Sequence, residues 1–198
     1  MEVAVIKYNA GNVFSVINAL SRLGVKSVLT DDAEVIRRAS HVIFPGQGEA
    51  AGAMNCLRST GLDQVIVNLR QPVLGICIGQ QLMCRHSEEG DVYCLGIFYT
   101  DVRKFIAPTD GNSWKIPHMG WNTVENLHGF MELGRQEEWM YFIHSYYVPQ
   151  SEWTVGTTSY CGVDFSAAMQ KDNFMAAQFH PEKSGEAGFR LLKHFLSI

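Results

Sequence analysis

Residues 73–83 read VLGICIGQQLM, and they decide the fold because a short apolar run changes there into a segment with helical periodicity. Glycine stands two positions before Cys77 and again two positions after it. A glycine-x-nucleophile-x-glycine sequence between a strand and a helix is typical of a nucleophile elbow, a sharp turn with a strained central residue. We therefore predict that a strand ends near Ile76, that a helix continues through Met83, and that the sulfur of Cys77 projects above a sheet.

The predicted helix would also assist the chemistry of Cys77. A helix N-terminus lowers the pKa of a nearby thiol, and it leaves the Ile78 N–H free to bind an oxyanion. A buried structural cysteine is the alternative at this point, because free cysteine packs as a small hydrophobic residue. Cys84 is expected two turns further along the same helix. The remaining cysteines have no such setting and are interpreted as structural: Cys56, Cys84, Cys94 and Cys161.

Outward from this stretch, strand-like runs alternate with segments of helical periodicity. Apolar runs of strand length lie at residues 3–8, 25–29, 41–44 and 73–76. Helical spacing fills residues 13–23, 50–58 and 62–69, and a short helix is expected after an N-cap at Asp31 or Asp32. Such alternation predicts an α/β fold with a mixed, mostly parallel sheet and flanking helices.

The second half of the chain changes to short strands separated by turns. We expect strands at residues 97–105, 140–144, 155–160 and 174–179, a loop at 107–113 and a C-terminal helix at 185–196. No internal repeat or linker interrupts the chain, so we predict one domain that covers residues 1–198.

Composition narrows the classes of partner and compartment. The net charge is −4 and no run of Lys or Arg occurs, so binding to nucleic acid or to an anionic membrane is not expected. The start of the chain lacks the basic segment of a signal peptide, and no apolar stretch approaches the roughly 18 residues that span a bilayer. Five cysteines without a C-x-x-C pair fit a reducing cytoplasm and indicate neither disulfides nor zinc. No metal motif, phosphate loop or cofactor signature is evident, so neither a metal nor a cofactor is expected.

A thiolate nucleophile needs an imidazole base, and the chain has seven histidines. His180 is favoured because it directly follows the strand-like run 174–179, and Pro181 ends that run at once. Glu182 is close enough in sequence to reach the distal nitrogen of the same imidazole and fix its tautomer. A surface histidine at a strand end is the alternative interpretation, and His144 is a second strand-end candidate without a carboxylate nearby in sequence.

These residues together resemble a known family. Residues 75–81 and the later Phe179-His180-Pro181-Glu182 resemble class I, triad-type glutamine amidotransferases, whose fold is flavodoxin-like. Within that class, residues 117–122 (PHMGWN), 144–146 (HSY) and 180–184 (HPEKS) are similar to the glutaminase subunits of imidazole glycerol phosphate synthase. The resemblance covers nearly the whole chain.

The resemblance implies a glutaminase whose catalytic triad is Cys77, His180 and Glu182. Cys77 would attack the side-chain amide carbon of L-glutamine, His180 would carry the proton to ammonia, and Glu182 would orient His180. The implied oxyanion donors are the main-chain N–H groups of Ile78 and Gln47. Valine is common at the position of Gln47 in those subunits, and we expect the change to be tolerated because the main chain acts there. The implied substrate-binding residues are Gly46, Gly48, Gln81, Ser145 and Tyr146.

The resemblance also implies a protein partner. This would be the cyclase subunit of imidazole glycerol phosphate synthase, a (β/α)8 barrel that forms a heterodimer with the chain, receives the ammonia and makes imidazole glycerol phosphate and an aminoimidazole carboxamide ribotide. The implied interface residues are Asn12, Pro117, Met119, Trp121, Tyr141 and Lys183. Without the resemblance, residues 117–122 have two interpretations: a loop anchored in the core by Trp121, or a surface whose Trp anchors an interface.

Three other functions share parts of this pattern. A free-standing cysteine hydrolase such as a γ-glutamyl hydrolase would share the elbow and the histidine, but it would not need residues 117–122 or Lys183. Glutaminase subunits for other acceptors, such as those of anthranilate or guanylate synthesis, are nearer alternatives. A non-catalytic binding module would have little reason to keep nucleophile, base and orienting carboxylate together.

Overall fold

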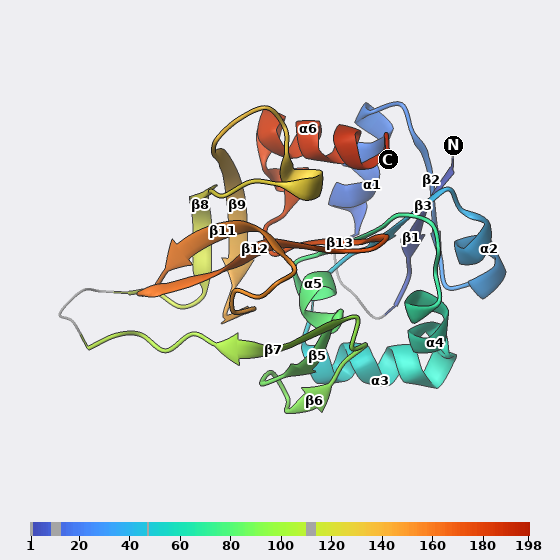
Figure 1. The fold of residues 1–198 in the computed structure, drawn as a ribbon. Helices are drawn as coiled ribbons and strands as arrows, with labels where there is room; N and C mark the ends of the chain where they lie inside the picture. The colour runs from blue at the N-terminus through green and yellow to red at the C-terminus, as the bar shows by residue number, and fades with distance from the viewer. Residues whose placement is uncertain (1, 9–12, 47, 110–113) are drawn as a thin grey trace.

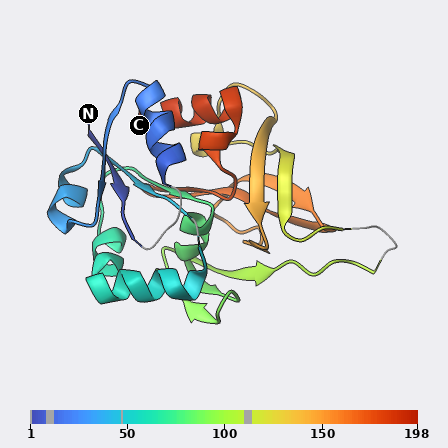
Figure 2. The same ribbon diagram turned by 180° about the vertical axis from the view of Figure 1, so that it is seen from behind.

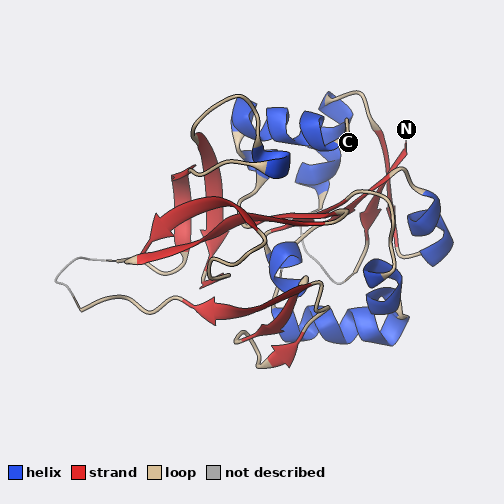
Figure 3. Cartoon of the chain, in the orientation of Figure 1, coloured by secondary structure: helices blue, strands red, loops and turns tan. Residues whose placement is uncertain are grey.

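The computed structural model describes residues 2–8, 13–46, 48–109 and 114–198. Within these residues, the sheet at the centre of the fold has seven strands. Its strand order is β11-β12-β13-β4-β3-β1-β2 (Figures 1 and 3). Strands β2, β1, β3, β4 and β13 are parallel, whereas β12 and β11 run antiparallel to their neighbours. The predicted mixed, mostly parallel sheet is therefore confirmed.

The strands of this sheet are β1 (Glu2–Ile6), β2 (Lys26–Thr30), β3 (His41–Phe44), β4 (Val73–Ile76), β11 (Thr154–Tyr160), β12 (Val163–Lys171) and β13 (Phe174–Ala177). The helices are α1 (Phe14–Arg22), α2 (Ala33–Arg38), α3 (Ala50–Thr60), α4 (Leu62–Val67), α5 (Ile78–Leu82) and α6 (Gly185–Phe195). Figures 1 and 2, which view the ribbon from opposite sides, show α1 and α6 together on one face of the sheet and α3, α4 and α5 on the other.

Alternation of side chains along β1 separates two hydrophobic clusters. Val3 and Val5 belong to the cluster under α1 and α6, whereas Ala4 and Ile6 belong to the cluster under α2, α3 and α4. Successive side chains of a strand point to opposite faces, so a strand covered on both faces is apolar throughout. The Asp32 carboxylate accepts from the N–H groups of the first turn of α2 and caps it, as predicted.

Two smaller sheets flank the large one. β5 (Cys84–Ser87), β6 (Val92–Tyr93), β7 (Phe98–Lys104) and β10 (Tyr146–Tyr147) pair in the order β10-β7-β5-β6. β8 (His118–Val124) and β9 (Glu138–His144) form a two-stranded antiparallel ribbon, in register from His118 opposite His144 to Val124 opposite Glu138.

Two sequence predictions are wrong in this region. The helix after Cys77 ends at Leu82, and Cys84 begins β5 instead of continuing the helix. No strand was predicted for residues 117–122, and the loop that was one of their two interpretations is wrong: residues 118–122 lie in β8, where Gly120 takes a φ of 140°. The pairing with β9 is a long-range contact, and the Pro and Gly of this segment conceal it from local patterns.

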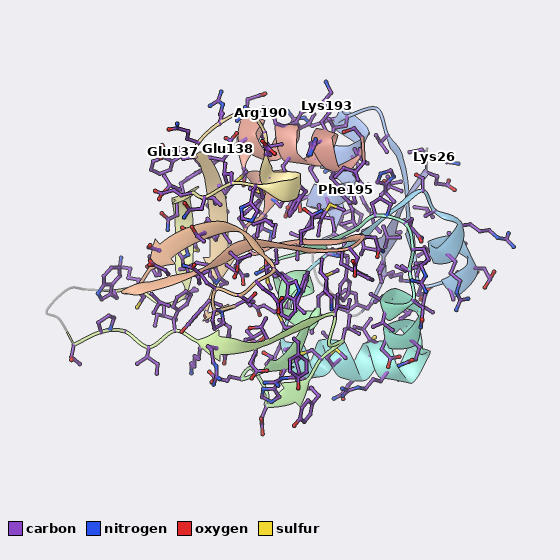
Figure 4. All side chains as sticks on the ribbon, in the orientation of Figure 1. Lys26, Glu137, Glu138, Arg190, Lys193 and Phe195 are labelled. Atoms are coloured by element: carbon purple, nitrogen blue, oxygen red, sulfur yellow. The ribbon has the colours of Figure 1, made fainter. Side chains whose placement is uncertain are left out.

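An ion pair fastens α6 to the ribbon. Arg190 of α6 donates from one terminal nitrogen to both carboxylate oxygens of Glu138 in β9, at 2.9 and 2.7 Å, and Figure 4 shows the two side chains between these elements. The Glu138 side chain is only 2% exposed, so it requires this partner. Among the described residues, no helix is long and apolar enough to cross a membrane.

Candidate active site

Cys77 lies at the sharp turn between β4 and α5. Its φ of 54° and ψ of −112° form a conformation that residues with a Cβ rarely adopt. The flanking glycines leave no room for a side chain: a Cβ at Gly75 would lie 3.0 Å from the Gly79 carbonyl oxygen, and one at Gly79 would lie 2.3 Å from that of Phe44. The predicted strand, strained turn and helix are confirmed, at the carboxyl end of a central strand.

The main chain around the elbow has an N–H group that can donate to a bound group. Ile78 is the first residue of α5, so its N–H has no carbonyl one helical turn earlier to bind. Gly46 packs directly against the elbow, because a Cβ there would lie 2.2 Å from the carbonyl oxygen of Ile76. Gln47, the expected second donor, lies outside the described residues. Gly48 follows with a φ of 112°, which favours glycine.

The fold places His180 at the same edge of the sheet as Cys77. It follows β13, which runs parallel to β4 with Ala177 opposite Ile76. Its Nδ1 lies 2.8 Å from Oε1 of Glu182, and the two side chains are 3% and 2% exposed. Because a carboxylate can only accept, Nδ1 carries a proton towards Glu182, and Nε2 is the nitrogen that can gain or lose one. The contact predicted between the imidazole of His180 and the carboxylate of Glu182 is therefore present in the structure.

Opposing effects set the pKa of His180. Burial lowers it, whereas the sulfur of Cys77 and the Glu182 carboxylate raise it, and the pKa reaches about 10. The Nε2 atom is buried and has no hydrogen-bond partner within the described part of the chain. The imidazole can therefore hold a proton beside a thiolate and keep one nitrogen available for a reacting group.

A cavity of about 250 Å³ opens onto Cys77. The residues predicted for the oxyanion hole and for substrate binding that line it are Ile78, Gly48, Gln81, Ser145 and Tyr146. The Gln81 Nε2 donates to the Tyr146 carbonyl at 3.0 Å, which joins α5 to β10 across the cavity. Gly46 is not part of the lining and lies against the elbow instead.

Glu89 also lines this cavity and was missed by sequence reasoning. It lies in a turn after β5, where no local pattern distinguishes it from other surface carboxylates. One of its oxygens accepts from the Ala50 N–H at 3.0 Å. Burial raises the pKa of its carboxyl, and the nearby charge of Glu49 raises it further. A cation bound in the cavity would relieve both effects.

His118 and His144 form a buried pair, of which His144 lines the cavity at Cys77. His144 Nδ1 lies 2.7 Å from the Tyr146 carbonyl oxygen, and its Nε2 lies 3.0 Å from Nδ1 of His118. The carbonyl can only accept, so His144 is protonated on Nδ1 and receives a hydrogen bond from His118. Burial lowers the pKa of His144 to about 3 and that of His118 to about 4. Both rings are neutral near pH 7, and His144 is committed to this network, which leaves His180 as the base candidate.

The outer face of the β8–β9 ribbon is apolar. Met119 and Trp121 of β8 are 63% and 52% exposed, as are Trp139 and Ile143 of β9 at 54% and 36%. The half-buried Tyr141 packs edge-on against Trp121, with ring centroids 6.0 Å apart. The alternative that Trp121 anchors a loop in the core is wrong. Sequence reasoning missed Trp139 and Ile143, because the strand that aligns them with Met119 and Trp121 was not predicted.

Two of the other residues predicted for the interface, Pro117 and Lys183, are described. Pro117 precedes β8 and lines the cavity at Cys77, and Lys183 is exposed next to Glu182. An open depression of about 840 Å³ continues the face between Trp121, Trp139 and the start of α6, and it does not include Cys77. Asn12 lies outside the described residues.

Comparison with known proteins agrees with this geometry. Residues 4–197 match the family model described as glutamine amidotransferase class-I. The imidazole glycerol phosphate synthase subunits HisH of Bacteroides fragilis and Bacteroides thetaiotaomicron are 59% and 55% identical, over the full length of both chains. That of Idiomarina loihiensis is 40% identical over all of this chain and 98% of its own.

Solved structures support the fold independently. A glutamine amidotransferase of known structure superposes with a TM-score of 0.74 at 18% identity, covering 98% of this chain and 97% of that one. Another, from Thermotoga maritima, superposes with a TM-score of 0.63 at 15% identity, covering 100% of this chain and 83% of that one. The chain belongs to the class-I glutamine amidotransferases and, within that class, to the family of the HisH subunits of imidazole glycerol phosphate synthase.

Proposed function

We propose that the chain hydrolyses glutamine to glutamate and ammonia with Cys77, His180 and Glu182, and passes the ammonia to the cyclase subunit of imidazole glycerol phosphate synthase in histidine biosynthesis. The observation that carries this proposal is the strained elbow of Cys77 beside a buried His180–Glu182 pair, at a cavity large enough for an amino acid. The full-length similarity to HisH subunits supports the choice of acceptor. The reaction belongs in the cytoplasm, where reducing conditions keep thiols free.

The first half of the reaction forms a thioester. The Cys77 sulfur attacks the side-chain amide carbon, and the negative charge that develops on the amide oxygen is bound by the Ile78 N–H. The protonated His180 gives its Nε2 proton to the nitrogen, the carbon–nitrogen bond breaks and ammonia leaves. Glu182 stabilises the positive charge of His180 before this transfer.

The second half restores the enzyme. Neutral His180 takes a proton from water while the water oxygen attacks the thioester carbon. The carbon–sulfur bond then breaks, the sulfur leaves as a thiolate next to the protonated imidazole, and glutamate departs. One water is consumed, and one glutamate and one ammonia are formed.

Glutamine is oriented by the polar lining of the cavity. The Gln81 side chain and the main chain of Ser145 and Tyr146 are the binding groups for its α-carboxylate and amine. Glu89 supports this assignment, since burial and the charge of Glu49 disfavour its carboxylate form and an α-ammonium group would compensate its charge. Gly48 lines the cavity, Gly46 packs against the elbow, and Gln47 is the second oxyanion donor of the proposal.

The apolar face of the β8–β9 ribbon is the docking surface for the cyclase. Exposed Trp side chains surrounded by polar residues are typical anchors of protein interfaces. Met119, Trp121 and Tyr141 contribute to this surface, Pro117 lies at its edge towards the cavity, and Lys183 and Asn12 are further proposed contacts. We assign a (β/α)8 barrel to the partner by resemblance to the family.

The assay uses the chain together with the cyclase subunit and its substrate. The wild-type pair should form imidazole glycerol phosphate from glutamine or from added ammonia, whereas the Cys77→Ala pair should use only added ammonia. Glutamine-dependent product with Cys77→Ala would overturn the proposal. A wild-type chain that forms glutamate but never serves this cyclase would indicate an amidotransferase for another acceptor.

We also propose that docking gates the reaction. An ungated thiolate would waste ammonia, and residues 45–48 contain two glycines that permit a peptide to rotate and present an N–H to the oxyanion. Such a donor is worth roughly a hundredfold in rate. Glutaminase rates should therefore rise from the isolated chain, to the complex, to the complex with acceptor bound. Equal rates in all three would contradict gating and favour a free-standing hydrolase.

A further inference from the structure

We propose that the side-chain amide of Gln178 donates a hydrogen bond to the Cys77 sulfur and stabilises its thiolate, so that Gln178 is a further catalytic residue. The inference rests on the proposed function, because it concerns the nucleophile of that reaction. Gln178 lies between β13 and His180, and its side chain is fully buried.

The contact is made at the reacting atom. The Nε2 atom of Gln178 lies 3.8 Å from the Cys77 sulfur, within hydrogen-bond range for this large atom. Among the described residues, the Gln178 side-chain nitrogen donates to no acceptor other than this sulfur. The main-chain N–H of Gln178 donates to Ala167 at 2.8 Å, which holds the residue in place next to the sheet.

A chain of hydrogen bonds fixes which end of the Gln178 amide faces the sulfur. The carbonyl oxygen of Tyr146 can only accept, so the Gln81 atom 3.0 Å from it is the NH₂ nitrogen. The same nitrogen lies 2.9 Å from Gln178, and that atom must therefore be the amide oxygen. The other end of the Gln178 amide, which faces Cys77, is then the NH₂ donor.

The charge of the sulfur decides how strong this contact is. A thiol is a weak acceptor, whereas a thiolate accepts a charge-assisted hydrogen bond that low-dielectric surroundings strengthen further. The Ile143 carbonyl oxygen also lies 3.7 Å from the sulfur, and it can accept a hydrogen bond only from the protonated thiol. The N–H group of Gln178 thus offsets the Ile143 carbonyl, which favours the neutral thiol. It still donates to the sulfur after His180 has given its proton to the leaving nitrogen.

The test compares Gln178→Met, which keeps an apolar chain of similar length but has no donor, with Gln80→Met as a matched control. Gln80 is equally buried, but its amide donates to the Ser166 carbonyl at 3.0 Å. The readout is the pH dependence of Cys77 alkylation by iodoacetamide, followed by mass spectrometry of the Cys77 peptide in the complex with the cyclase.

We expect the midpoint of alkylation to move upward by about one pH unit in Gln178→Met, and the glutaminase kcat/KM at pH 7 to fall about tenfold and recover at higher pH. Gln80→Met should keep the wild-type midpoint. Equal midpoints in Gln178→Met and wild type would overturn the inference. If Cys77 of the wild-type chain were not alkylated at any pH, the proposed nucleophile itself would be refuted.

A measurement on the unaltered protein covers the case in which Gln178→Met does not fold. The side-chain amide protons of Gln178, followed by NMR, should shift with pH at the same midpoint as Cys77 alkylation. Alkylation of Cys77 should abolish that titration. Amide protons that do not respond to pH while Cys77 titrates would overturn the inference.

Discussion

The main-chain N–H of His180 donates to the carbonyl oxygen of Tyr141 at 2.9 Å, so the base of the proposed mechanism is bonded directly to strand β9. The Tyr141 N–H donates to the Ser184 hydroxyl at 2.9 Å, which itself donates to the His180 carbonyl at 2.6 Å. Two residues further along β9, the Ile143 carbonyl contacts the Cys77 sulfur. The strand whose outer side chains form the proposed docking surface therefore contacts both His180 and Cys77 with its main chain.

Trp121→Ala should weaken the complex with the cyclase by about 2 kcal/mol, roughly thirtyfold in Kd, because a half-exposed Trp in an apolar face is a typical interface anchor. Tyr93→Ala is the matched control. Tyr93 is 70% exposed and lies on β6, far from the ribbon in Figure 1. Titration calorimetry measures both affinities. An equal loss in both variants, or none in Trp121→Ala, would contradict the assignment of the surface.

Glu182→Gln should retain the fold but lower glutaminase kcat on the order of a hundredfold, because the imidazole loses its negative partner and its fixed tautomer. His180→Ala should lose more, and Glu132→Gln, at an exposed site, should lose nothing. The pKa of His180 should also fall in Glu182→Gln, since the carboxylate is one of the groups that raise it. If Glu182→Gln kept full activity in the complex, the triad would reduce to a Cys77–His180 dyad.

Glu89→Gln should raise the KM for glutamine with little change in kcat, because a group that binds the α-ammonium in ground state and transition state alike alters only binding. Glutaramate, which lacks the α-amino group, provides the matched comparison. Wild type should prefer glutamine strongly, and Glu89→Gln should lose most of that preference. A preference that survives the substitution would show that Glu89 does not recognise the amine.

Acid should destabilise the fold through His118 and His144. Their folded pKa values of about 4 and about 3 lie below the ordinary value near 6.5. Their stabilising contribution is therefore complete above pH 6.5 and is lost as the pH falls, by on the order of 2 kcal/mol for each ring at pH 5. His118→Phe, which preserves the stacking on Tyr160, should lose less stability between pH 7 and pH 5 in urea unfolding. A loss as large as in wild type would contradict the assignment.

The local signals in the sequence were sufficient for the centre of the fold. The glycines around Cys77 and the apolar runs at residues 41–44 and 73–76 predicted β3, β4 and the elbow, because each depends on neighbours in the sequence. The carboxylate of Glu182 was predicted for the same reason, since one short turn brings it to His180.

Contacts between distant segments could not be predicted in this way. The ribbon strand β8 depends on pairing with β9, and its Pro and Gly conceal the strand pattern. Gln178 contacts Cys77 from about a hundred positions away, and Glu89 enters the cavity from a turn. Nothing local distinguishes these side chains from packing or surface residues, and only the assembled fold brings them near Cys77.

The most direct test of the proposed mechanism is the site of covalent labelling by a glutamine analogue with a chloroketone in place of the side-chain amide. The analogue should alkylate Cys77 in the complex, and prior addition of glutamine should protect the thiol. Burial raises the pKa of Cys94 to about 12 and that of Cys84 well above its ordinary value, so these thiols should react slowly. Peptide mapping that places the label on Cys77 agrees with the mechanism, and a label mainly on Cys84 or Cys161 would contradict it.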